Sequence, residues 1–227
     1  AFKVLLCYYS QQEDIVVGSP ISNRNSKQIE SLIGIFINTL VIRTDLSGNP
    51  TFLELLSRLR KNCLQAYEHQ DVPFQQVITE LNIERDPSLP PLVLAAFIFQ
   101  NTPNFSLEMP NLTINKVKII SQAAKTDLTL SMEEKEEKII GDLEYNTDLF
   151  EPETIAQIID NFSKIVETIV INQQQTISEI ITALTSDNLP LKANAKSKLK
   201  PQITQEHEYV APRTEAEHRL AQIWSSL

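Results

Sequence analysis

The chain has 227 residues, which is enough for one sizeable domain or two small ones. With 42% hydrophobic and 22% charged residues it can build a packed core, which excludes wholesale disorder. The net charge of −9 argues against a nucleic-acid partner, and no apolar run reaches the roughly 18 residues that a membrane span needs. Cys7 and Cys63 sit among apolar residues, so we expect two reduced core cysteines in a cytoplasmic protein.

The first predicted elements are a helix and a buried strand. Phe2, Leu5 and Tyr9 recur at helical spacing, and the stretch DIVVGSPIS that follows is typical of a strand buried within a sheet. The segment SLIGIFINTLVIRTDL, residues 31–46, is predicted as a short helix end followed by a buried strand. Its Asn, Thr and Arg residues do not fit a purely apolar strand and need a separate explanation.

Two helices are predicted next. Thr51 and Glu54 form a T-x-x-E capping box, which opens a helix running to about His69. Its predicted buried face consists of Phe52, Leu55, Leu56, Leu59, Cys63 and Leu64. Pro73 then begins a shorter helix that ends near Leu81.

Strands dominate the middle of the chain. The run LVLAAFIF predicts a fully buried strand, and further strands are predicted over residues 112–120, 127–132 and 139–145. The last two alternate apolar and polar residues, and EEKEEK between them is predicted as the solvated loop of a hairpin. Its carboxylates Glu133 and Glu134 therefore fit a solvated loop better than an acid–base pair.

Two helices close the predicted fold. Pro152 opens the more regular one, and its apolar stripe consists of Ile155, Ile158, Ile159, Phe162, Ile165, Val166 and Ile169. Thr176 and Glu179 cap a last short helix ending near Leu184, and residues 185–208 are predicted as a polar linker. Helices and strands mix without strict alternation, so the expected fold class is α/β, with a mixed β-sheet covered by helices.

No pattern of catalytic or metal-ligating residues is evident. His69, His207 and His218 lack ligand spacing, so no metal site is expected. The chain has only four glycines and no nucleophile elbow, P-loop or dinucleotide-binding fingerprint. Composition and spacing alone therefore predict a soluble α/β domain and do not indicate its function.

Particular strings of residues carry a family resemblance. IGIFINTLVIR (33–43), HQDVPFQ (69–75) and RDPSLPPL (85–92) resemble, in order and spacing, the later motifs of nonribosomal peptide synthetase condensation domains. DIVVGSPISNR and LEYNTDLFEPETI are similar to the stretches before and after them, so the resemblance covers residues 1–184. It implies a chloramphenicol-acetyltransferase-like fold of two lobes, with the active site in a tunnel between them.

The resemblance also implies an activity. Condensation domains form an amide bond between groups carried on the phosphopantetheine of donor and acceptor carrier domains, within modular synthetases that make antibiotics and other secondary metabolites. The family's paired-histidine motif, HHxxxDG, is absent here, so the chain resembles only the second lobe. We therefore expect no catalytic residue and no directly bound cofactor in this chain, which would be inactive without the first lobe.

The tail resembles two other synthetase segments. NLPLKANAKSKLKP (188–201) is similar to a decayed end of an adenylation domain, with Lys196 at the position of that family's catalytic lysine. YVAPRTEAEHRLAQIW (209–224) resembles the start of a peptidyl-carrier domain, so residues 209–227 are expected to be a truncated carrier domain. An adenylation domain deleted between the two would explain this order.

Three residues are candidates for active-site support. By resemblance, Arg24 pairs with the Asp of HHxxxDG, so that an isolated second lobe leaves it unpaired; the alternative is a surface loop arginine. Asn38 either lines the tunnel floor or, with Thr39, hydrogen-bonds neighbouring backbone where the sheet splays. Asp127 opens a strand facing the cleft and is the third candidate.

The other polar residues have structural interpretations. Arg43 is expected to be solvated or ion-paired on its strand. Gln70 and Asp71 are expected to end one helix and cap the next, and His69 is not the catalytic histidine. Two functions stay open: the second lobe of a condensation domain, or a degenerate, non-catalytic docking module between carrier domains.

Overall fold

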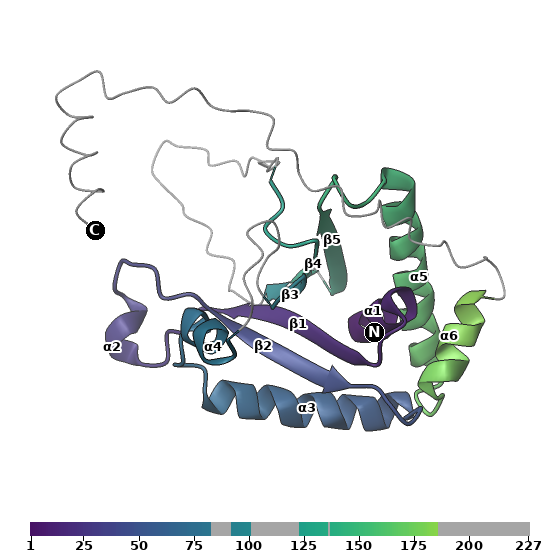
Figure 1. The fold of residues 1–227 in the computed structure, drawn as a ribbon, viewed down its shortest axis with the longest axis horizontal. Coiled ribbons are helices and arrows are strands. Elements are labelled where there is room, and N and C mark those ends of the chain that lie inside the picture. The colour runs from purple at the N-terminus through teal and green to yellow at the C-terminus, as the bar shows by residue number, and fades with distance from the viewer. Residues whose placement is uncertain (83–91, 101–122, 136, 186–227) are drawn as a thin grey trace, which may run out of the picture. The chain divides into compact units, whose positions relative to one another are not determined.

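The computed structural model describes residues 1–82, 92–100, 123–135 and 137–185 (Figure 1). The helices are α1 (Phe2–Ser10), α2 (Lys27–Glu30), α3 (Phe52–Glu68), α4 (Phe74–Glu80), α5 (Pro152–Ile171) and α6 (Ile177–Thr185). The strands are β1 (Asp14–Ile21), β2 (Asn38–Asp45), β3 (Ala95–Gln100), β4 (Leu128–Lys135) and β5 (Lys138–Tyr145). The expected strand at 112–120, the linker and the carrier-like tail lie outside these residues.

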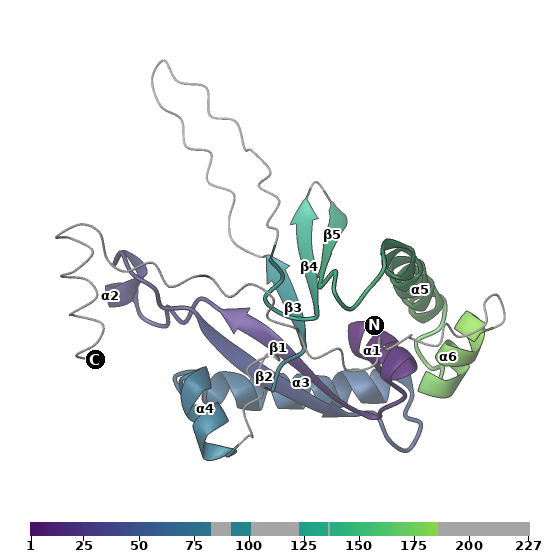
Figure 2. The same cartoon turned by 45° about the horizontal axis from the view of Figure 1, so that its top comes forward.

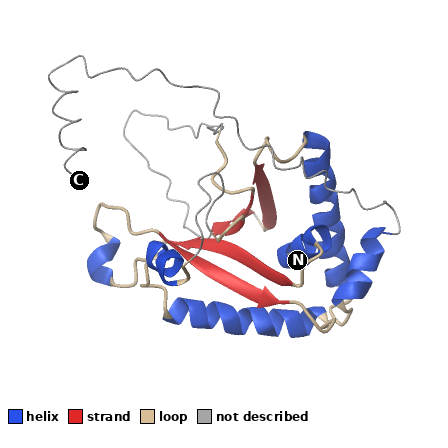
Figure 3. Cartoon of the chain, viewed as in Figure 1, coloured by secondary structure: helices blue, strands red, loops and turns tan. Residues whose placement is uncertain are grey.

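The described strands, red in Figure 3, form one five-stranded mixed sheet. Their order is β2-β1-β3-β4-β5. β1 pairs antiparallel with β2 and parallel with β3, while β4 runs parallel to β3 and antiparallel to β5. The predicted α/β class with a mixed sheet is therefore confirmed. β1 lies between two strands, as its apolar sequence predicts.

One face of this sheet carries the core. Ile15 and Val17 of β1 and Leu128 and Leu130 of β4 belong to a single buried cluster with apolar residues of α1, α3, α5 and α6. On β2, Leu40, Ile42 and Thr44 are buried while Arg43 is exposed, because successive strand residues face opposite sides of the sheet.

The core also contains a lysine that the sequence patterns do not predict. Lys3 of α1 is buried, and its Nζ donates hydrogen bonds to the Ile42 carbonyl at 2.5 Å, Thr44 Oγ1 at 2.7 Å and the Ile15 carbonyl at 3.3 Å. Burial lowers the pKa of Lys3 from 10.5 to about 8. Lys3 therefore fastens α1 to both strands β1 and β2.

The capping predictions for two helices are confirmed. Thr51 Oγ1 accepts the Glu54 N–H while Glu54 accepts the Thr51 N–H, which completes the capping box of α3. Thr176 and Glu179 exchange the same pair of bonds at the start of α6.

Several predictions of burial are wrong. In Figure 2 α3 lies alongside β2. Leu55 is buried there, whereas Leu56 and Leu64 are exposed, because a helix covers only one side against a sheet. Cys63 is only half-buried. The strand in LVLAAFIF is buried at Ala95 but exposed toward its end.

The segment EEKEEK is not simply a loop: residues 133–135 continue β4, and Lys138 begins β5.

The segment 31–46 also differs from its prediction. It contains no helix after Ser31, and its strand begins only at Asn38. Ile33, Ile35 and Ile37 precede that strand and are exposed, so the apolar run is not wholly a buried strand.

Candidate functional site

Three segments meet at one end of the β1–β2 pair. Ile21, the last residue of β1, pairs with Asn38, the first residue of β2. The loop 22–37 connects them, and the link 69–73 between α3 and α4 is bonded to both. We call this arrangement the polar junction.

Asn38 holds the centre of the polar junction. Its Nδ2 donates to the carbonyls of Gln70 and Val72, both at 2.8 Å, and its Oδ1 accepts the Phe74 N–H at 3.0 Å. The side chain thus satisfies the backbone of another segment, as one of the two interpretations of Asn38 requires. Those partners lie in the link between α3 and α4 and at the first residue of α4 rather than in a splayed neighbouring strand. Thr39, next along β2, is half-buried opposite Pro20.

Arg24 organises the loop 22–37. Its Nη1 donates to the carbonyls of Ile29 at 2.6 Å, Leu32 at 2.9 Å and Glu30 at 3.2 Å, and its Nη2 donates to that of Gly34 at 3.3 Å. The guanidinium also lies over the Phe36 ring, 4.4 Å from its centroid.

Arg24 is therefore held by backbone carbonyls of its own loop, whereas the expectation concerned an ion pair with the Asp of the first lobe. Five planar N–H groups allow one guanidinium to serve several carbonyls at once. No described carboxylate forms an ion pair with it.

A second amide joins the loop to the link. Asn25 Nδ2 donates to Asp71 Oδ1 at 3.1 Å across 46 residues of sequence. The prediction that Asp71 caps α4 is wrong: Pro73 occupies the N-cap position without a side-chain bond, and Asn38 accepts the Phe74 N–H instead. No sequence signal marks Asn25 or predicts that it contacts Asp71.

Asp127 lies in a different part of the sheet. Its backbone N–H bonds to the Leu94 carbonyl at 2.9 Å, at the start of β3 and β4. Asn38, by contrast, lies on β2, level with the last residue of β1, so the structure does not bring Asp127 together with Asn38 and Arg24. Partial burial raises the pKa of the Asp127 carboxyl above its usual value.

Arg43 is ion-paired, as expected. Its Nε lies 3.0 Å from both carboxylate oxygens of Asp14, and its Nη2 lies 2.8 Å from Oδ2. The bonds from Arg43 lower the pKa of Asp14. Both side chains are largely exposed, so this pair is a surface feature of the β1–β2 ribbon.

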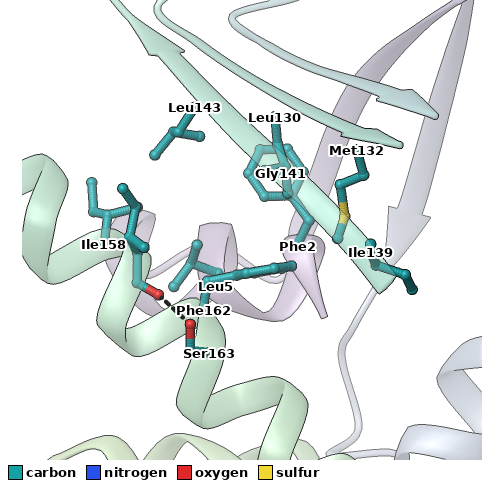
Figure 4. A pocket seen from close by; sticks show the side chains of 11 residues that line it. Phe2, Leu5, Leu130, Met132, Ile139, Gly141, Leu143, Ile158, Phe162 and Ser163 are labelled. Atoms are coloured by element: carbon teal, nitrogen blue, oxygen red, sulfur yellow. Dashed lines mark hydrogen bonds between the residues drawn. The ribbon is translucent and has the colours of Figure 1, made fainter. Parts of the chain in front are cut away.

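An apolar pocket of about 230 Å³ lies between α1, α5 and the β4–β5 hairpin (Figure 4). Phe2 and Leu5 line it from α1, Phe162 from α5, and Met132 and Leu143 from the hairpin (Figure 4). It contains none of the predicted site residues. Its Ser163 hydroxyl donates to the Ile159 carbonyl of the same helix at 3.1 Å, so it does not point a free polar group at a ligand.

The described ranges offer neither a metal centre nor a membrane span. They hold no cluster of three or more His, Cys, Asp or Glu side chains suited to a metal ion. Among the helices described, none is both long and apolar enough to cross a lipid bilayer.

Known proteins share both sequence and fold with this chain. It is 41% identical over 182 residues to gramicidin S synthase 2 of Brevibacillus brevis, covering 79% of this chain and 4% of that protein. It is 46% identical over 155 residues to malpinin synthetase of Mortierella alpina, covering 68% of this chain and 2% of that protein. The chain thus spans only a small part of these relatives.

Solved structures agree with the sequence matches. The X-domain from teicoplanin biosynthesis superposes with a TM-score of 0.72 at 27% identity, covering 77% of this chain and 41% of that one. The condensation domain of the monacolin K polyketide synthase has the same fold, with a TM-score of 0.68 at 19% identity, covering 78% and 41% of the two chains. The sequence profile of the family described as "Condensation domain" matches residues 1–189. This chain therefore belongs to the condensation domain family of nonribosomal peptide synthetases.

Proposed function

We propose that this chain is the second lobe of a condensation domain in a cytoplasmic synthetase, where it helps to join two carrier-bound groups by an amide bond. The observation that carries the proposal is the match itself. The chain aligns over 77% of its length with a solved relative, yet covers only 41% of that relative. A second lobe, with a first lobe outside these residues, accounts for both numbers.

The number and positions of the histidines support the proposal that catalysis depends on the first lobe. Amide formation requires a group that positions or deprotonates the attacking amine. The sequence contains three histidines, at positions 69, 207 and 218, and no two are adjacent. His69, the only one in the described ranges, is exposed at the C-cap of α3. We therefore assign the catalytic base to the first lobe.

In this proposal Arg24, Asn38 and Asp127 support the active site without reacting. Asn38 and Arg24 would fix the polar junction, and Asp127 would face the cleft separately from them. The substrates would arrive on the phosphopantetheine of donor and acceptor carrier domains, so this chain itself would bind no cofactor. Its partners would be those carrier domains, the first lobe and other synthetase modules.

The proposal for the tail, residues 185–227, rests on its sequence alone. Residues 185–208 would be a linker that keeps the remnant of an adenylation-domain end, and residues 209–227 would begin a carrier domain. Sequencing the gene beyond Leu227 tests this: a carrier domain with its phosphopantetheine-bearing Ser is expected. A downstream region without that Ser would contradict it.

The decisive experiment compares amide formation by two proteins. The 227-residue chain and the domain extended to include HHxxxDG are each mixed with loaded donor and acceptor carriers, and the peptide product is measured by mass spectrometry. We expect product only from the extended domain. Product from the short chain would overturn the assignment of the base, and no product from the extended domain would favour a non-catalytic docking module.

A further inference from the structure

The apolar pocket between α1, α5 and the β4–β5 hairpin is large for a space inside one lobe (Figure 4). Its volume is about 230 Å³, whereas packed interiors contain few voids larger than a water molecule. An apolar cavity of about 150 Å³ is enough to hold a benzene molecule. Apart from Ser163, every residue that lines the pocket is apolar or glycine, and the Ser163 hydroxyl already donates to the Ile159 carbonyl. The pocket therefore suits a hydrocarbon group.

Gly141 leaves part of this space open. β5 pairs with β4 in unbroken register, so the glycine marks no bulge, and its φ is not positive. A Cβ atom there would lie 3.6 Å from the Ser131 carbonyl oxygen and 3.9 Å from side-chain atoms of Leu130 and Met132, which are ordinary contact distances. Neither the backbone nor crowding thus requires glycine at this position. A glycine inside a strand is also typical of a site that a ligand approaches closely.

Two isoleucines mark the mouth of the pocket. Ile139 of β5 is 63% exposed and Ile159 of α5 is 47% exposed, whereas Leu5 and Ile158, which also line the pocket, are buried. An alkyl chain that enters would contact apolar side chains along its length. A polar group carried inside would lose its hydrogen bonds to water and find no partner, so it would stay at the mouth.

We infer that this pocket binds the hydrocarbon chain of a small molecule, whose polar end remains in water. The site is separate from the polar junction: the junction lies on β1 and β2, and the β4–β5 hairpin forms the other edge of the described sheet. None of Arg24, Asn38 and Asp127 lines the pocket, so the inference does not depend on the proposed function. A bound chain would contact α1, α5 and the hairpin together and would stabilise their packing.

The test uses the 227-residue chain with carbon-13 in its methionine methyl groups. The sequence has two methionines, Met109 and Met132, so Met109→Leu assigns the Met132 signal in the NMR spectrum. The probe is n-hexanol, and the matched control is hexanediol with a hydroxyl at each end of the same chain. We expect n-hexanol to shift the Met132 signal to saturation. The diol should need a concentration higher by roughly tenfold or more, because its buried hydroxyl would have no partner.

A pair of variants locates the binding. Gly141→Val places a side chain in the pocket and should abolish the saturable shift. Val170→Leu enlarges a 72% exposed side chain of α5 outside the lining and should leave the shift unchanged. Circular dichroism checks that both variants fold; if Gly141→Val does not, the two alcohols compared on the unmodified chain decide alone. Equal affinity for the two alcohols, a shift that does not saturate, or unchanged binding in folded Gly141→Val would each overturn the inference.

Discussion

Asn38 and Phe74 are joined across 36 residues of sequence: the Oδ1 of Asn38 accepts the backbone N–H of Phe74 at 3.0 Å. The first N–H groups of a helix have no partner within the helix, and α4 begins after a proline that supplies no side-chain cap. A residue at the start of a strand therefore caps a helix that is distant in sequence. Two of the family's motifs are physically connected through this bond.

Asn38→Ala should destabilise the chain. It removes three hydrogen bonds to backbone groups, two of which are part-buried, so we expect the free energy of unfolding to fall by about 1–3 kcal/mol. Urea unfolding followed by circular dichroism measures it. Asn62→Ala is the control, because Asn62 makes a single bond, to the Arg43 carbonyl. Equal losses in the two variants would contradict the role of Asn38.

Arg24→Lys should loosen residues 32–37, which lead into β2, while keeping the charge. A lysine ammonium can neither reach four carbonyls in a fork nor lie flat over Phe36, so amide hydrogen exchange in residues 32–37 should accelerate by about tenfold. Arg58→Lys is the control, because Arg58 bonds to carbonyls at the opposite end of β2. Unchanged exchange in Arg24→Lys would show that the loop does not depend on the guanidinium.

Lys3 should make stability depend on pH. The folded chain holds the Lys3 proton less tightly than the unfolded chain, because burial lowers the pKa from 10.5 to about 8. The contribution of Lys3 to the free energy of unfolding therefore rises as the pH increases from about 8 to 10.5. Relative to Lys3→Met, the chain should gain about 1–3 kcal/mol across that window, as measured by urea unfolding at each pH. A difference that is independent of pH would contradict this.

Gly18→Ala should be tolerated poorly. A Cβ atom at Gly18 would lie 2.5 Å from Cγ1 of Val93, whereas at Gly141 the nearest atom would be 3.6 Å away. Overpacking of this kind lowers the free energy of unfolding by about 1–3 kcal/mol, and we expect Gly141→Ala to change it by less than about 1 kcal/mol. Thermal and urea unfolding compare the two variants. Similar effects at both positions would show that Val93 moves aside.

Local patterns predicted most elements because they report local physics. The capping box at Thr51 and the stripe from Ile155 to Ile169 depend on neighbours within one or two helical turns. Burial was predicted less well: the pattern at Leu56 and Leu64 is helical, but only the position of α3 on the sheet decides which side is covered. The same limit applies to Ile33 and Ile35, whose apolar character suggested an interior strand.

Local sequence was sufficient for the α/β class, for the order of most elements and for membership of the condensation family, since periodicity, caps and motif strings are properties of neighbouring residues. The roles of the polar residues, by contrast, depend on how distant segments pack together. Asn38, Arg24 and Lys3 act on backbone groups brought close by the fold, and Asp127 is separated from the first two by the register of the sheet. Hydrogen bonds depend on distance in space, which local patterns do not contain.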